Sequence, residues 1–190
     1  MLIQRENALL LVVDIQEKLA PAILDAETAV ANNVRLISGA RRLKVPVFVS
    51  EQYVRGLGPS VAAIREAAAS SEAGAVPTVD VVFFEKIHFG CAGEPGVLEM
   101  LRATGRRQVL LTGMESHVCV LQTALGLLEA GFEVFLIADA SSSRTAANRS
   151  AAVERLRAAG CGIVTTEMVL FEWLHKAGTD EFRALLPLIK

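Results

Sequence analysis

The sequence has few of the features that mark a secreted, membrane-spanning or nucleic-acid-binding protein. Only three of its 190 residues are cysteines, Cys91, Cys119 and Cys161, and an odd number without paired spacing does not support a disulfide framework. The 19 basic and 21 acidic side chains leave a net charge of −2, which favours neither nucleic acid nor an anionic membrane as a partner. No apolar run approaches the roughly 18 residues of a membrane span. We therefore expect a cytoplasmic protein that acts on a small-molecule substrate.

The residues that are plentiful indicate one globular domain. Hydrophobic residues make up 52% of the chain, and a chain of this length can bury a large core in a single domain. The first apolar run, ALLLVVD, is interrupted by Asp14 and is not followed by a small-residue cleavage site, so we do not interpret it as a signal peptide. We expect a single domain over residues 1–190.

Short apolar, β-branched runs alternate with longer amphipathic segments along the chain. The runs predict six strands, at 8–14, 45–50, 79–85, 107–113, 132–139 and 161–166. The other segments predict helices at roughly 25–44, 60–72, 95–105, 117–130, 146–159 and 167–188, and loops at 51–59 and 69–78. Because the runs are apolar on both faces, they are typical of parallel strands between two helical layers. The predicted fold is α/β, a three-layer α-β-α Rossmann-like sandwich with a mostly parallel sheet of about six strands.

Polar residues at the carboxyl ends of the strands form the candidate site, because ligands of open parallel sheets bind there. Asp14 ends the first strand, where a helix cap, an edge salt bridge or a site role would satisfy its carboxylate. Lys86 lies at the end of the third strand. It is either a surface lysine or a residue whose long side chain places the ammonium group in the ligand-binding crevice at the strand ends. Gln16 would orient a ligand or face solvent, and Arg144 would belong to a turn or anchor a substrate carboxylate.

The fourth predicted strand leads into the segment GMESHVCV, residues 113–120. We expect Ser116 to cap the following helix, which places Cys119 in its first turn. The free N–H groups and the helix dipole there should lower the pKa of the thiol and hold an oxyanion. Taken alone, Cys119 is a small core hydrophobe. With an acid and a cation at neighbouring strand ends, it becomes a nucleophile with a base and an electrostatic stabiliser.

Four stretches, LLLVVDIQEKL, SEQYVRGLGPSV, FFEKIHFGC and LLTGMESHVCVLQTALGLLEAGFEVFLIADASSSR, occur in the order found in the isochorismatase-like cysteine hydrolases. The sequence resembles this family over most of its length, and most of all the branch that contains YcaC and the isochorismatase-domain proteins. The resemblance implies a catalytic Asp14, Lys86 and Cys119 and a cis peptide between Met114 and Glu115. It also implies an oxyanion hole made by the N–H groups of Glu115 and Cys119, and a homo-oligomer.

The resemblance and the cysteine together favour hydrolysis of a C–N bond, in an amide or ureide-like group, through an acyl-enzyme. We expect no metal and no cofactor. Some nicotinamidases of the superfamily carry an Asp-x-His metal site in this region, but the corresponding stretch of this chain, SEQYVRGLGPS, contains no histidine. Two alternatives stay open: a catalytically silent or redox-sensing α/β scaffold, and isochorismatase-type hydrolysis of a vinyl ether. We expect five residues to contribute to substrate binding: Gln16, Tyr53, Leu57, Phe89 and His117.

Overall fold

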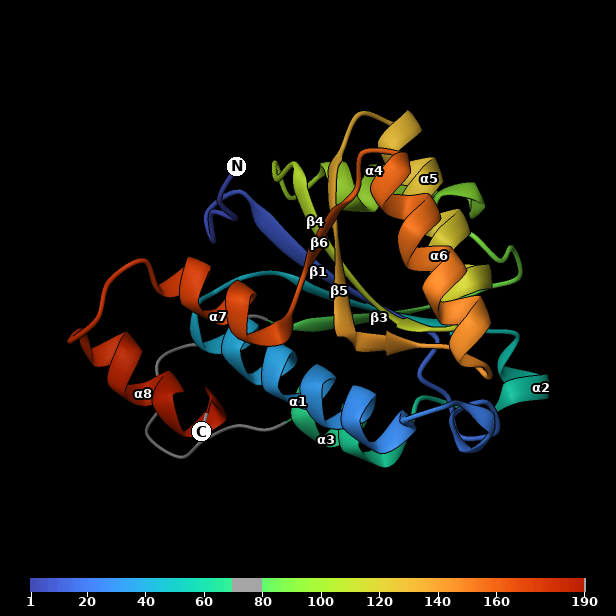
Figure 1. Cartoon of the computed structure of the whole chain (residues 1–190), viewed down its shortest axis with the longest axis horizontal. Helices are drawn as coiled ribbons and strands as arrows, with labels where there is room; N and C mark the ends of the chain where they lie inside the picture. The colour runs from blue at the N-terminus through green and yellow to red at the C-terminus, as the bar shows by residue number, and fades with distance from the viewer. Residues whose placement is uncertain (70–79, 190) are drawn as a thin grey trace.

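The structure is a computed structural model and describes residues 1–69 and 80–189. Six strands form one sheet in the order β3-β2-β1-β4-β5-β6, and every neighbouring pair is parallel (Figure 1). The strands are β1 (Ala8–Val13), β2 (Val47–Gln52), β3 (Val81–Lys86), β4 (Gln108–Met114), β5 (Glu133–Ser142) and β6 (Gly162–Val164). Helices cover both faces of the sheet, which confirms the predicted three-layer α/β sandwich.

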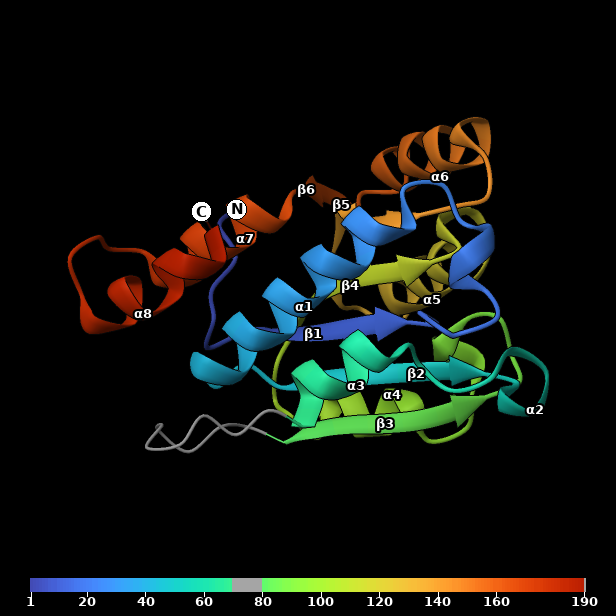
Figure 2. The same ribbon diagram turned by 90° about the horizontal axis from the view of Figure 1, so that it is seen from below.

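The helices form two layers, which Figure 2 shows in front of and behind the sheet. One layer contains α1 (Ala26–Arg42), α3 (Ala62–Ala69), α7 (Thr166–Leu174) and α8 (Asp180–Ile189). The other contains α4 (Val97–Arg102), α5 (Leu121–Glu129) and α6 (Ala146–Ala158). The short helical segments are η1 (Ala20–Ala22), α2 (Val54–Leu57), η2 (Cys91–Gly93) and the π-helix η3 (Ser116–Val120). None of the described helices is long and apolar enough to cross a bilayer.

The central strand β1 explains why the sheet needs both helical layers. All six of its residues are buried, and successive side chains point to opposite faces. Leu10 belongs to the core on the α1 side, and Leu11 belongs to the core on the α5 side. An apolar strand of this kind is stable only when both of its faces are covered.

The structure corrects several sequence predictions. The run at 79–85 was expected to be buried on both faces, but strand β3 lies at the sheet edge and its Val82 and Phe83 are exposed. The predicted helix 167–188 is two helices, α7 and α8, because the chain turns at His175 with φ +54°. The segment 51–59, predicted as a loop, contains the short helix α2. The loop predicted at 69–78 lies outside the described residues except for Ala69, which ends α3.

The parallel strands bring their carboxyl ends to one edge of the sheet, and in Figure 2 the arrowheads of β1 to β3 point towards α2. Within this edge Val13 pairs with Ser50 of β2 and with Gly113 of β4. Gly113 has φ +120°, and a Cβ atom there would overlap the Val13 carbonyl group. Only glycine therefore lets β4 approach β1 this closely at the point where both strands end.

Candidate active site

Asp14, Lys86 and Cys119 meet at the carboxyl edge of the sheet. The chain turns at Asp14 with φ +52° directly after β1, and the Asp14 side chain is fully buried. Lys86 Nζ lies 2.7 Å from Asp14 Oδ2, and the Cys119 thiol interacts with the same carboxylate, so that each influences the pKa of the other. The structure thus brings together an acid, a cation and a thiol that are widely separated in the sequence.

Lys86 is held by four acceptors and is not at the surface. Its ammonium group donates to Asp14 Oδ2, to Gln52 Oε1 at 2.5 Å, and to the carbonyl oxygens of His88 at 3.2 Å and Phe89 at 3.0 Å. The side chain has no exposed area. Of the two placements left open by the sequence, the surface lysine is therefore wrong, because the ammonium group lies beside Asp14 and the chain after β3 folds over it. A buried cation requires such partners.

Sequence reasoning missed two polar residues of β2 that complete this cluster. Ser50 Oγ donates to Asp14 Oδ1 at 2.7 Å, and Gln52 accepts from Lys86. The two residues are two positions apart in the strand, so their side chains lie on the same face of the sheet. The sequence contained a signal, since the run SEQ at 50–52 places three polar residues at the end of an otherwise apolar strand.

Gln16, predicted to orient a ligand, is fully buried and has its amide group engaged by main-chain atoms. Its Nε2 donates to the carbonyl oxygens of Gln52 at 2.9 Å and Gly58 at 2.6 Å, and its Oε1 accepts from the Gln52 N–H at 2.8 Å. These bonds tie the chain after β1 to the segments on either side of α2. Gln16 therefore fixes the rim of the site.

Three other predicted substrate-binding residues lie near Lys86 or on the adjoining helix α2. Tyr53 is 54% exposed and its N–H donates to the Lys86 carbonyl at 2.9 Å. Phe89 is 55% exposed, and its carbonyl accepts from Lys86 Nζ. Leu57 is partly buried at the end of α2. Main-chain atoms of Tyr53 and Phe89 therefore contact Lys86, while both residues are more than half exposed.

The chain enters η3 through a cis peptide bond between Met114 and Glu115. The predicted Ser116 cap is wrong, because Glu115 occupies the N-cap position and the Ser116 hydroxyl is buried without a hydrogen-bond partner in the described part of the chain. The Glu115 carboxylate accepts from the main-chain N–H and the Nε of Arg144, both at 3.0 Å. Arg144 therefore fixes the first residue of this turn.

His117, the fifth predicted substrate-binding residue, is held by two side chains. Its Nδ1 lies 3.0 Å from Ser143 Oγ, and its Nε2 lies 3.3 Å from Asn148 Nδ2. Because an amide nitrogen is a donor, Nε2 accepts this bond and the proton of the neutral ring is on Nδ1. The ring is partly exposed and joins η3 to the start of α6.

The electrostatics of the cluster differ from the prediction for the thiol. Burial raises the pKa of the Asp14 carboxyl, against the opposing effects of Lys86 and Ser50. Burial and the Asp14 charge also raise the pKa of the Cys119 thiol above its ordinary value. The expected lowering of the thiol pKa is therefore wrong, because the thiol is desolvated and its closest charge is a carboxylate. A protonated thiol bonded to a carboxylate is arranged to give that carboxylate its proton.

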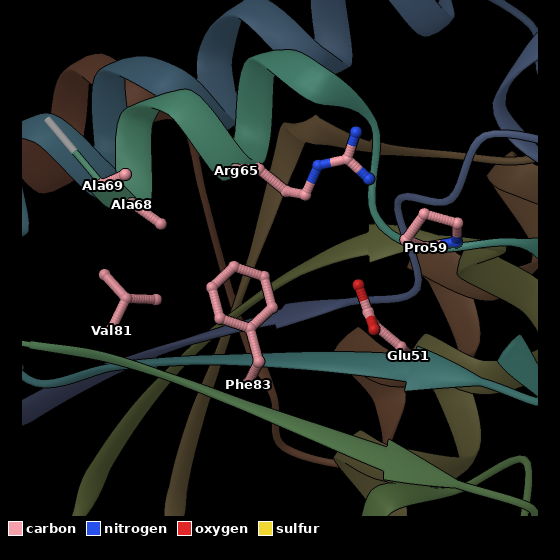
Figure 3. A pocket seen from close by; sticks show the side chains of 7 residues that line it. All are labelled: Glu51, Pro59, Arg65, Ala68, Ala69, Val81 and Phe83. Carbon is pink, nitrogen blue, oxygen red and sulfur yellow. The ribbon is translucent and has the colours of Figure 1, made fainter.

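A separate pocket opens on the other side of the sheet (Figure 3). It has a volume of about 400 Å³ and is lined by Glu51, Pro59, Arg65, Ala68, Ala69, Val81 and Phe83. Glu51 and Ser50 are consecutive in β2 and point to opposite faces, so the sheet separates this pocket from Asp14. None of the predicted site residues lines it.

A metal centre has no support in the side chains at hand. Within residues 1–69 and 80–189, no group of three or more His, Cys, Asp and Glu side chains could hold a metal ion. The three cysteines are free and buried. That the site works without metal or cofactor stays a prediction.

Comparisons with known proteins identify relatives over nearly the whole chain. A family model described as isochorismatase domain matches residues 8–168. A Phytophthora sojae protein described as secreted isochorismatase effector Isc1 is 37% identical over 186 residues, which are 97% of this chain and 85% of that protein. The structure of MAR1 ribonuclease from Caenorhabditis elegans has a TM-score of 0.89 and 33% identity, covering 100% of this chain and 92% of that one. Escherichia coli YcaC, described as an octameric hydrolase of unknown specificity, has a TM-score of 0.86 and 22% identity, covering 99% and 90%.

Proposed function

Because the chain belongs to the isochorismatase family, we propose that it is a cysteine hydrolase that cleaves a C–N bond in an amide or ureide-like group of a small metabolite. The observation that carries the proposal is one buried carboxylate, Asp14, that is bonded to the Lys86 ammonium group and interacts with the Cys119 thiol. Nucleophile, base and stabilising cation are the parts that acyl transfer requires.

In the proposed reaction, Asp14 takes the thiol proton as Cys119 sulfur attacks the substrate carbonyl carbon. The raised pKa of Asp14 makes it a stronger base, and Lys86 stabilises its charge until the proton arrives. Asp14 then returns the proton to the departing amine as the C–N bond breaks and a thioester forms. Water, deprotonated by the same carboxylate, attacks the thioester and releases the carboxylic acid and the thiol.

The N–H groups of Glu115 and Cys119 would hold the oxyanion that forms during attack. The Glu115 N–H donates to no acceptor in the described ranges 1–69 and 80–189, and two bonds from Arg144 fix the Glu115 side chain. The π-helical turn of η3 between these two residues sets the direction of their N–H groups, and such turns are frequent at functional sites. These features support a preformed hole.

The test is turnover of a panel of primary amides, anilides and ureides, with amine release and the intact mass of the protein as readouts. We expect an acyl adduct on Cys119 in the wild type, and loss of amine release by at least about 10³-fold in Cys119→Ser and Asp14→Asn. Cys161→Ser is the matched control, because Cys161 is equally buried and is not bonded to Asp14. Full activity in Cys119→Ser, or an adduct on another residue, would contradict the proposal.

The names of two relatives suggest other reactions. The P. sojae relative is described as an isochorismatase, and vinyl-ether hydrolysis that needs no thiol would survive in Cys119→Ser. The C. elegans relative is named a ribonuclease, but the net charge of −2 does not favour binding to RNA phosphates. A redox sensor is also disfavoured, because oxidants attack thiolates and this thiol is held protonated.

We propose a homo-oligomer in the cytoplasm. Val82 and Phe83 are exposed on the edge strand β3, and an open apolar edge favours association with another chain. YcaC is described as octameric. Sedimentation at micromolar concentration should give a species heavier than 20.3 kDa. A stable monomer would contradict the oligomer, and export of the tagged protein, as the name of the secreted P. sojae relative implies for that protein, would contradict the localisation.

A further inference from the structure

We propose that Ser50 and Cys91 are positioning residues that keep the Asp14 carboxylate ionised and oriented, through a line of hydrogen bonds that ends on the oxygen Lys86 does not contact. The inference deepens the proposed function, since it concerns the base of the same reaction. It assigns a role to a buried thiol that the hydrolysis itself does not use.

Ser50 is built into the carboxyl edge next to Asp14. It pairs with Val13 across the sheet, its carbonyl accepts from the Asp14 N–H at 3.1 Å, and its hydroxyl donates to Asp14 Oδ1 at 2.7 Å. Main chain and side chain of one fully buried residue therefore both hold Asp14. The second carboxylate oxygen, Oδ2, is bonded to Lys86.

Cys91 approaches Ser50 from the helical layer that contains α5. It is fully buried at the start of η2, and its N–H donates to Thr123 Oγ1 at 2.9 Å. Thr123 follows Cys119 by four residues, so the two share one face of the helical segment. The Cys91 thiol interacts with the side chains of Ser50 and Thr123, which influence its pKa. The loop before it is tightly seated, because a Cβ on Gly90 would lie 3.1 Å from the Gln122 main chain.

The direction of these bonds follows from the acceptor at the end. Since Asp14 is bonded as a carboxylate, Ser50 donates its proton to it and its oxygen is left to accept from the Cys91 S–H, a weak donor. Burial raises the pKa of Cys91 to about 11, so this thiol stays protonated wherever the enzyme is folded at ordinary pH. Each donor stabilises the ionised form of Asp14 over the protonated form.

The titratable groups that face Asp14 are Lys86 from the end of β3, Cys119 from η3 and Cys91 from η2. Ser50 is the neutral donor among them. Removal of the Ser50 hydroxyl leaves Lys86 and Cys119 in place, so its effect on Asp14 can be measured separately. The third cysteine, Cys161, has its thiol directed to the Gly162 carbonyl at 3.5 Å and provides a control.

The experiment follows alkylation of Cys119 by iodoacetamide from pH 4 to 9, resolved by residue with mass spectrometry. The rate rises as Asp14 ionises, because the carboxylate assists removal of the thiol proton. In Ser50→Ala we expect the acid-side midpoint of this rise to move to higher pH by on the order of one unit, a tenfold change in proton affinity. Cys91→Ala should move it the same way by less, Cys91→Ser should move it slightly to lower pH because a hydroxyl is a stronger donor than a thiol, and Cys161→Ala should leave it unchanged.

A purely structural role would lower the melting temperature or the rates without moving the midpoint. An unchanged midpoint in folded Ser50→Ala overturns the proposal, and an unchanged midpoint in Cys91→Ala alone overturns the part assigned to Cys91. If Ser50→Ala does not fold, Ser50→Cys replaces the hydroxyl by a weaker donor and should give a smaller shift in the same direction. Asp14→Asn should abolish the acid-side rise, which identifies the titrating group.

The alkylation readout needs no substrate, so it separates this inference from the proposed function. Shifted midpoints without turnover of any amide would retain the role of Ser50 and Cys91 and count against C–N hydrolysis. Amide turnover that depends on Cys119, with no midpoint shift in either variant, would support C–N hydrolysis and overturn the role of Ser50 and Cys91.

Discussion

Replacement of Lys86 by methionine is the perturbation whose outcome the structure determines most directly. The side chain has no exposed area, and its ammonium group contacts four acceptors. Methionine removes the cation and leaves the buried Asp14 carboxylate without its charged partner. Loss of one member of a buried ion pair destabilises a protein by about 3–5 kcal/mol. For a chain of this size, each kcal/mol lowers the melting temperature by about 2–4 °C, which gives a loss of about 6–20 °C.

The size of this loss should depend on pH, with a sign that follows from Asp14. Without the ammonium group, burial raises the pKa of Asp14 further above its unfolded value of about 3.9. A carboxyl group with a raised folded pKa contributes its full stability below the unfolded pKa and loses it as pH rises through the folded pKa. Burial already raises the Asp14 pKa in the wild type. Lys86→Met should therefore lose stability relative to the wild type by up to about 1.4 kcal/mol per pH unit once pH exceeds the wild-type pKa of Asp14, until Asp14 ionises in the folded variant.

The assay is urea unfolding followed by circular dichroism at several pH values between 5 and 8. The variants are Lys86→Met, Asp14→Asn and the double variant, and Lys18→Met is the control because Lys18 is exposed. The double variant should be more stable than Lys86→Met at pH 8, since it no longer buries a lone charge. A Lys86→Met protein within about 1 kcal/mol of the wild type, or a double variant less stable than Lys86→Met, would refute the reasoning.

Three further outcomes follow from the structure. Gly113→Ala should give an unstable or insoluble protein in expression and melting assays, whereas Gly105→Ala, with positive φ but open space, should lose only about 1–2 kcal/mol. In the wild type, the bonds that the Glu94 carboxylate accepts from the N–H groups of Ile87 and His88 should weaken as pH falls from about 4.5 towards 2, because the His88 side chain and these bonds lower the pKa of Glu94 to about 2. Proteolysis of the 87–94 loop should show this, and Glu94→Gln should remove the pH dependence. Turnover should fall as pH decreases through the pKa of Asp14, which burial raises above 3.8, and a profile that stays flat down to pH 3.8 would contradict that assignment.

The order of strands and helices was predictable because it depends on local composition. ALLLVVD is buried on both faces as expected, and short connections between strands and helices imply a parallel sheet. The position of a strand within the sheet is a different matter. VVFFEK is as apolar as the buried strands, yet β3 lies at the edge, because strand order depends on how the helices pack and not on any one run. The same tertiary packing divides the tail into α7 and α8.

Some residues of the candidate site could likewise be predicted from the sequence, and others could not. Asp14, Lys86 and Cys119 were found because each ends or follows a strand whose position could be read from the sequence. Ser50 and Gln52 were missed, since their contacts with Asp14 and Lys86 are fixed by the register of β2 with β1 and β3. The sign of the Cys119 pKa shift was missed because burial and a neighbouring carboxylate, which oppose the helix dipole, are properties of the folded site.

A high thiol pKa is compatible with nucleophilic catalysis when the base is bonded to the thiol. In the proposed hydrolase, Cys119 becomes a thiolate only as Asp14 accepts its proton, and that transfer is favourable only when the oxyanion hole stabilises the charge passed on to the substrate. The thiol should then react more slowly with oxidants and stray electrophiles than a thiol of ordinary pKa, because these reagents respond to the resting thiolate fraction. A carbonyl group seated against the N–H groups of Glu115 and Cys119 would still react. Selectivity therefore follows from the burial that raises both pKa values, and a sensor, which must respond without such a substrate, would require the opposite arrangement.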